Sequence, residues 1–326
     1  KELLSSPQVK KVAALVSRRL GRKLQPFDIW YPGLRGGAGM SEEELDRIVR
    51  EKYPDAAALE KDLPAILVKT GFSPERAAFI AARVQVDPAR GSGHNAQAQS
   101  RKFKSRLRTR VAAGGMNYKG YNIALHEFGH AVENVLDLHR IDHYALAGVP
   151  TGAVTEAFAF IFQERDLELL GVQEPGPRQL ELKALDTFWG AYEIMGVSLV
   201  DMQAWRWLYD HPQATPKQLK KAVLDIAREV WNRYYAPVFG VRNQEILAAY
   251  SHMIHYTLYL PHYALGTVIQ FQLEDYLKDK VLGPEMERMC AAGNITPQEW
   301  MKNAVGKGIS VKPLLRAVDR ALKIAK

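Results

Sequence analysis

The segment His126-Glu127-Phe128-Gly129-His130 constrains this chain most, because it spaces two imidazoles four residues apart. Residues four apart share one helix face, so His126 and His130 can bind the same metal ion. Glu127 lies about 100° around the helix and can reach a water on that metal. Zinc lowers the pKa of such a water toward about 7, and a carboxylate can accept the released proton. The segment therefore predicts a hydrolytic zinc site with Glu127 as general base.

A catalytic zinc needs a third protein ligand and one open position. The metzincin arrangement is excluded, because the positions of its glycine and third histidine hold Glu133 and Leu136. Glu156 is a lone carboxylate in an apolar and aromatic segment, where an unpaired charge would be costly. Metal ligation removes that cost. We therefore expect His126, His130 and Glu156 to bind one Zn²⁺ ion.

Composition narrows the class of protein further. The chain has 326 residues, 47% hydrophobic and 25% charged, as in ordinary globular proteins. A single cysteine, Cys290, excludes a disulfide framework and a thiolate zinc site, and we expect it to be only a packing or surface residue. No stretch approaches the roughly 20 apolar residues of a membrane span. We expect a cytoplasmic protein without a membrane partner.

The net charge of +8 raises the question of nucleic-acid binding. The basic residues are dispersed, apart from a run over residues 101–110. Within it, Arg106, Arg108 and Arg110 alternate with other residues, and this period of two predicts a strand with one basic face. We expect that face to be solvated, or to lie near an acidic substrate terminus, rather than to bind nucleic acid.

Most of the remaining pattern indicates helices. Capping signals open helices at Ser41 and Ser73. Short β-like runs cover 84–86 and 107–111, and a turn at Gly114-Gly115 precedes a returning strand over 116–121. The expected later helices cover about 123–138, 153–170, 178–209, 216–234, 242–259, 262–280, 297–304 and 312–324. Gly129 costs roughly 1 kcal/mol in mid-helix, which indicates that something packs closely there.

The metal motif and Glu156 together resemble the gluzincin peptidases, and within them the thimet oligopeptidase and oligoendopeptidase F family. The angiotensin-converting enzyme and carboxypeptidase Taq families share this architecture. Flanking segments agree with the family's patterns: Phe27-Asp28-Ile29-Trp30-Tyr31, Val86-Asp87-Pro88-Ala89-Arg90, Tyr263-Ala264-Leu265-Gly266 and Gln270-Phe271-Gln272. The resemblance implies a mainly α, neurolysin-like zincin catalytic domain with a small antiparallel β patch before the metal helix.

The resemblance also implies roles beyond the metal ligands. Tyr263 matches a tyrosine that donates a hydrogen bond to the developing oxyanion, and such a donor stabilises charge in the transition state. The relatives also use a histidine upstream of that tyrosine. His252 best fits the spacing, while His255 and His262 compete for the role. The family's additional tyrosines are replaced by Thr267 and Gln270, so their roles do not carry over.

Residues 113–118 are placed where gluzincins hold substrate backbone against an edge strand, although a plain hairpin turn fits equally well. The resemblance implies one catalytic domain over residues 1–326. Because the chain begins with Lys1, we expect it to be the C-terminal part of a longer protein. The favoured function is hydrolysis of oligopeptides. A gluzincin-like carboxypeptidase and a non-catalytic scaffold are the alternatives, and the oligomeric state is open.

Overall fold

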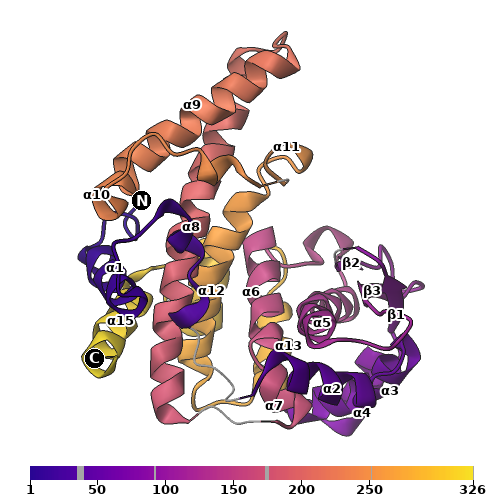
Figure 1. The fold of residues 1–326 in the computed structure, drawn as a ribbon. Coiled ribbons are helices and arrows are strands. Elements are labelled where there is room, and N and C mark those ends of the chain that lie inside the picture. The colour runs from indigo at the N-terminus through magenta and orange to yellow at the C-terminus, as the bar shows by residue number, and fades with distance from the viewer. Residues whose placement is uncertain (35–39, 92, 173–175, 251, 326) are drawn as a thin grey trace. The chain divides into compact units, whose positions relative to one another are not determined.

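The computed structural model describes residues 1–34, 40–91, 93–172, 176–250 and 252–325. Its contacts divide the chain into two compact units, each assembled from segments that are distant in sequence. Unit 1 comprises Lys1–Gly36, Pro175–Val268 and Ser310–Lys326, and unit 2 comprises Gly37–Glu174 and Ile269–Ile309. Helices dominate both units (Figure 1). None of the helices that are described is long and apolar enough to cross a membrane.

Unit 1 is helical, and its longest helix is α8 (Pro177–Asp210). The other elements are α1 (Pro7–Leu20), η1 (Pro26–Trp30), η2 (Pro32–Leu34), α9 (Pro216–Tyr234), α10 (Ala236–Phe239), η4 (Ile246–Ala248), α11 (His252–His255), the start of α12 (Leu260–Leu277) and α15 (Lys312–Ile324). Its core contains an aromatic cluster from α8, α9 and the segment that follows, formed by Trp189, Tyr192, Trp231, Tyr235 and Phe239. These rings pack the helices through large buried areas.

Unit 2 places α5 (Tyr118–Arg140) in its hydrophobic core, between α6 (Gly152–Gln163) and a small sheet (Figure 1). The other helical elements are α2 (Glu42–Lys52), α3 (Ala56–Lys69), α4 (Pro74–Ala81), η3 (Tyr144–Leu146), α7 (Asp166–Leu170), the end of α12, α13 (Leu282–Cys290) and α14 (Pro297–Val305). The predicted capping of α2 is confirmed, since the Glu44 backbone N–H donates to the Ser41 side chain. Cys290 is fully buried in this core, so of the packing and surface positions that the sequence left open it takes the packing one.

The sheet contains β1 (Val84–Ala89), β2 (His94–Ala96) and β3 (Ser105–Arg110), in the order β1-β3-β2. It is mixed rather than purely antiparallel. β2 pairs antiparallel to β3, whereas β1 pairs parallel to it, because the chain passes through β2 and a loop before it returns beside β1. In β3, buried and exposed residues alternate, which confirms the predicted strand with one basic face.

The returning strand predicted over 116–121 is wrong. Gly115 turns the chain with a φ of +101°, as the glycine pair indicated. The next residues then begin the metal helix, because the Asn117 side chain accepts from the Gly120 backbone N–H at 2.9 Å and caps α5. The expected substrate strand over 113–118 is therefore a turn and a helix cap. The alternation of apolar and polar residues concealed the capping asparagine.

The helix predicted over 242–259 is also wrong. Only η4 and α11 are helical within the described part of that stretch. Asn243 has a left-handed backbone with φ of 59°, and its backbone N–H donates to the Asn232 side chain at 2.8 Å. Leu258 is left-handed as well. Both residues interrupt the regular helical backbone that the hydrophobic pattern suggested.

Candidate metal centre

Three side chains from two neighbouring helices converge in unit 2. His126 and His130 come from α5, and Glu156 comes from α6. One ligand atom from each residue lies within 4.8 Å of the others. The Nε2 atoms of His126 and His130 lie 3.4 and 3.8 Å from the Glu156 carboxylate oxygens. The structure therefore brings together the three residues that the sequence predicted as metal ligands.

Gly129 explains how α6 comes close enough to supply Glu156. A Cβ atom at Gly129 would lie 2.7 Å from the Ala159 Cα atom and 2.9 Å from the Phe158 carbonyl oxygen. Real side chains do not tolerate such distances, so only glycine permits this crossing. The prediction that something packs closely at Gly129 is confirmed. Because the crossing lies one turn from Glu156, it fixes the position of that carboxylate relative to His126 and His130.

A chain of amides orients His126. The His126 Nδ1 atom lies 3.0 Å from the Gln163 Oε1 atom, and the Gln163 amide donates to Asn122 at 2.7 Å. The Asn122 amide in turn donates to Asp166 at 2.6 Å. Since the Gln163 oxygen faces the imidazole, Nδ1 carries a proton, and Nε2 is the nitrogen whose lone pair a bound metal ion would use.

Burial controls the charge of the site. Burial lowers the pKa of His130 to about 4, so this imidazole is neutral near pH 7 and can donate its lone pair. Burial also opposes protonation of His126, but hydrogen bonding and the charge of Glu156 outweigh it and raise the pKa of His126. Glu156 is only 1% exposed. A buried carboxylate is stabilised by a nearby positive charge, which a protonated imidazole or a bound cation can provide.

The donor set fits a divalent cation. Two imidazole nitrogens and one carboxylate oxygen are a donor set that can hold a divalent metal ion. The tautomer of His126 and the neutral state of His130 supply the lone pairs that such an ion needs.

Glu127 lies beside this set and stays outside it. Its side chain is 7% exposed, and burial raises its pKa to about 7. The charge of His126 and the Asn95 backbone N–H oppose that rise, whereas the charge of Glu156 adds to it. A carboxyl group with a pKa near 7 can both take and return a proton at neutral pH.

Strand β2 runs close to Glu127. A Cβ atom at Gly93, next to the start of β2, would lie 3.3 Å from the Glu127 Oε1 atom and 2.2 Å from the Ile123 Cγ2 atom. The Asn95 backbone N–H on β2 donates a hydrogen bond to the same carboxylate. The other edge of the sheet is occupied, because the Val86 backbone N–H donates to Glu60 on α3 at 2.8 Å. In the order β1-β3-β2, β2 is the edge strand beside Glu127 among the described residues.

The two further predicted catalytic residues belong to unit 1. His252 forms the start of α11, and Tyr263 lies in the first turn of α12. Their ring centroids lie 6.3 Å apart, and the Tyr259 ring lies 5.3 Å from that of Tyr263. The structure therefore brings His252 and Tyr263 together within unit 1, and their roles stay predictions. His255 stacks edge-on against Tyr256.

Sequence reasoning missed Gln163 and Asn122, the amides that orient His126. Helical spacing could have indicated both residues. Asn122 precedes His126 by four residues and so shares its face, and Gln163 lies two turns after Glu156 on α6.

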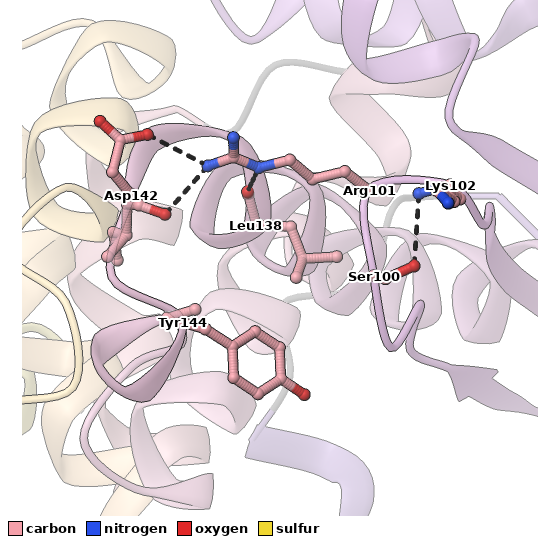
Figure 2. Close-up of a pocket in the computed structure, with 8 residues that line it drawn as sticks. Ser100, Arg101, Lys102, Leu138, Asp142 and Tyr144 are labelled. Atoms are coloured by element: carbon pink, nitrogen blue, oxygen red, sulfur yellow. Dashed lines mark hydrogen bonds and ion pairs between the residues drawn. The ribbon is translucent and has the colours of Figure 1, made fainter.

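A separate pocket lies at the C-terminal end of α5 (Figure 2). It is lined by Ser100, Arg101, Lys102, Leu138, Ile141, Asp142, Tyr144 and Ala147. Arg101 donates to the carbonyl oxygens of Leu138 and Ile141, and so satisfies acceptors at the helix end. None of the three converging metal-site residues lines this pocket, and the guanidinium has a structural role there.

Comparisons with known proteins identify the fold. No family model and no curated protein matches the chain. Solved structures do match. PZ peptidase A, solved with an inhibitor, has a TM-score of 0.58 at 14% identity over 96% of this chain and 61% of its own. A structure assigned as oligoendopeptidase F has a TM-score of 0.57 at 15% identity, over 95% of this chain and 60% of its own.

A chain assigned as a peptidase from Chlamydophila abortus gives a TM-score of 0.61 at 12% identity. The match covers 98% of this chain and 52% of that one. The present chain thus spans between about half and three fifths of the length of these solved chains. The likeness confirms the predicted fold class, a mainly helical zincin-like peptidase fold with a small sheet.

Proposed function

We propose that this chain is a zinc-dependent metallopeptidase that hydrolyses oligopeptides. One observation carries the proposal: His126, His130 and Glu156 converge on one point, with the Glu127 carboxyl group beside them. The same fold occurs in proteins whose names describe peptidases. We further propose that the oligoendopeptidase type of action applies, and that both units form a single catalytic domain.

Each residue has a distinct role in this proposal. His126, His130 and Glu156 would hold the zinc ion, which when bound supplies a Lewis acid that polarises a carbonyl and acidifies water. Glu127 takes the proton from the attacking water and passes it to the leaving amine. Its pKa of about 7 suits both transfers. Tyr263 and His252 are proposed to stabilise the negative charge that develops on the substrate oxygen.

We propose that the edge strand β2 holds the substrate backbone. An extended peptide can add to such an edge through main-chain hydrogen bonds. Gly93 and Asn95 bring this edge beside Glu127. This assignment replaces residues 113–118, which form a turn and the cap of α5.

The test uses internally quenched oligopeptides with a free or amidated C-terminus, and the zinc content of the same protein. We expect about one zinc per chain and cleavage of both peptide forms. Glu127→Gln should keep the zinc and lose at least about 10²-fold in turnover, because the amide cannot accept the proton. Glu43→Gln, an exposed change on α2, is the matched control and should leave turnover unchanged.

The outcomes separate the alternatives. Cleavage of free peptides alone, one residue at a time, would favour a carboxypeptidase. A folded, zinc-loaded protein that cleaves neither form would favour the scaffold. Near-normal turnover by Glu127→Gln would remove Glu127 as the base.

A further inference from the structure

The outer face of the sheet in unit 2 carries three arginines that the proposed chemistry does not use. Arg106, Arg108 and Arg110 on β3 are exposed, while the residues between them face the buried side. Their side chains therefore project from the face of the sheet opposite α5.

Two of the three arginines are committed to neighbours. Arg106 forms an ion pair with Asp87 on β1, with its Nε atom 2.7 Å from the carboxylate. Arg110 donates to the Gly91 carbonyl oxygen at 2.7 Å. Arg108 makes no hydrogen bond and no ion-pair contact within the described part of the chain, although its charge helps to lower the pKa of Asp87. Its guanidinium is therefore available to a ligand.

Arg108 lies on the central strand β3, beside the edge strand β2. It is the cross-strand partner of His94 on β2, and Arg106 is the partner of Ala96. His94 and Ala96 are exposed on the same face as the arginines. Neighbouring strands lie about 4.8 Å apart, so a peptide added to β2 would run roughly 10 Å from β3. An arginine and a glutamate side chain can together span that distance above β2.

We propose that Arg108 selects peptides with an acidic side chain at the position that pairs with His94. This inference rests on the proposed binding of substrate along β2. Successive side chains of a strand point to opposite faces, so only the residue opposite His94 projects toward Arg108. Its two neighbours project toward α5. The preference is therefore specific to one position, unlike the general attraction of a chain with net charge +8 for acidic peptides.

The expected effect is modest, because exposed ion pairs contribute little in water. A contribution typical of such pairs corresponds to about a two- to five-fold preference for glutamate over glutamine. Added salt should reduce it, because ions screen exposed charges.

The experiment scans a neutral fluorescent octapeptide with a single Glu, Gln or Lys at each position. Binding to the zinc-loaded Glu127→Gln protein is measured by fluorescence anisotropy, which does not require turnover. We expect one position at which Glu binds most tightly and Lys most weakly, flanked by positions without a preference. Arg108→Gln should abolish this difference, and Arg108→Glu should reverse it.

Lys302→Glu on α14 is the matched control, because it makes the same change of charge at another exposed position. It should leave the positional preference intact. The inference is overturned if Arg108→Gln keeps the preference, if Lys302→Glu removes it equally, or if glutamate is favoured at every position. A protein that shows the preference in binding but cleaves no peptide would support the inference and contradict the proposed peptidase activity.

Discussion

At the scale of single residues, Gln163 determines which nitrogen of His126 faces the metal position. Its amide oxygen lies 3.0 Å from Nδ1, and its amide nitrogen is held by Asn122. Removal of such a partner typically weakens metal binding or activity by 10- to 100-fold, on the order of 1–3 kcal/mol. We expect Gln163→Ala to weaken zinc affinity by about that factor, measured by competition with a chromogenic chelator.

Gln163→Glu is the control for this prediction. It keeps an oxygen acceptor for the His126 N–H but cannot donate to Asn122, so it should retain more zinc affinity than Gln163→Ala. Equal losses in both variants would contradict the role of the acceptor.

The three proposed metal ligands could be predicted from the sequence alone. The four-residue spacing of His126 and His130 indicates a shared helix face, and Glu156 is a lone carboxylate in an apolar segment. Gln163 could not be predicted in this way, because its function depends on a contact between two helices.

At the scale of elements, the close crossing of α5 and α6 depends on Gly129. A methyl group there would collide with the α6 backbone, which cannot yield as a flexible side chain would. We expect Gly129→Ala to lower the free energy of unfolding by about 1–3 kcal/mol, as overpacked cores do. It should also weaken zinc binding, because α6 carries Glu156. Urea unfolding and zinc titration measure the two effects.

Gly190→Ala in α8 is the matched control. Nothing lies within 4 Å of a Cβ atom at Gly190, so alanine should be neutral or stabilise the helix by up to about 1 kcal/mol. The contrast between the two glycines is the prediction. Equal effects of both substitutions would mean that helix propensity, rather than the crossing, decides the cost.

A second feature of α5 is a buried acidic pair, Glu133 and Asp137, which follows the predicted metal ligands along the helix. Asp137 is 2% exposed, and burial raises its pKa well above the usual range, with Glu133 adding to the rise and Cys290 opposing it. A raised folded-state pKa gives stability that is complete below the unfolded pKa and is lost as the pH rises. One such proton changes the free energy of unfolding by ~1.4 kcal/mol per pH unit while it titrates.

Asp137→Asn should therefore flatten the decline in stability above about pH 4, since an amide does not ionise. We expect the variant to gain stability relative to the natural chain as the pH rises from 5 to 8, in urea unfolding with chelator present. Glu43→Gln, an exposed acid on α2, should show no such gain. A pH-independent difference between Asp137→Asn and the natural chain would contradict the buried, protonated state of Asp137.

The elements also show where the sequence was insufficient. Helix α9 begins and ends at the predicted residues, because Thr215 caps it and the apolar period is regular. The stretch over 242–259 has a similar apolar content, but left-handed residues and contacts from α9 keep its described part from forming one helix. Likewise, the residues around Asn117 alternate between apolar and polar, which suggested a strand, although Asn117 caps a helix. Local pattern predicts regular helices well and interruptions poorly.

At the scale of the whole molecule, unit 2 contains the metal residues and unit 1 contains Tyr263. Both units are assembled from segments distant in sequence, so this division was not visible as a linker or a change in composition. The proposed function assigns roles to residues of both units. Tyr263→Phe tests the role proposed for a residue of unit 1, because the change removes one hydroxyl group there and leaves every proposed ligand in unit 2 in place.

If Tyr263 donates a hydrogen bond to the developing oxyanion, Tyr263→Phe should lower kcat by about 10²- to 10³-fold, or ~3–4 kcal/mol in the barrier. Zinc content and KM should change little, because the bond forms mainly in the transition state. Tyr259→Phe is the matched control, since its ring lies 5.3 Å from that of Tyr263 in unit 1. A loss of kcat in both variants would indicate a packing effect. An unchanged kcat in Tyr263→Phe would remove Tyr263 from the proposed mechanism.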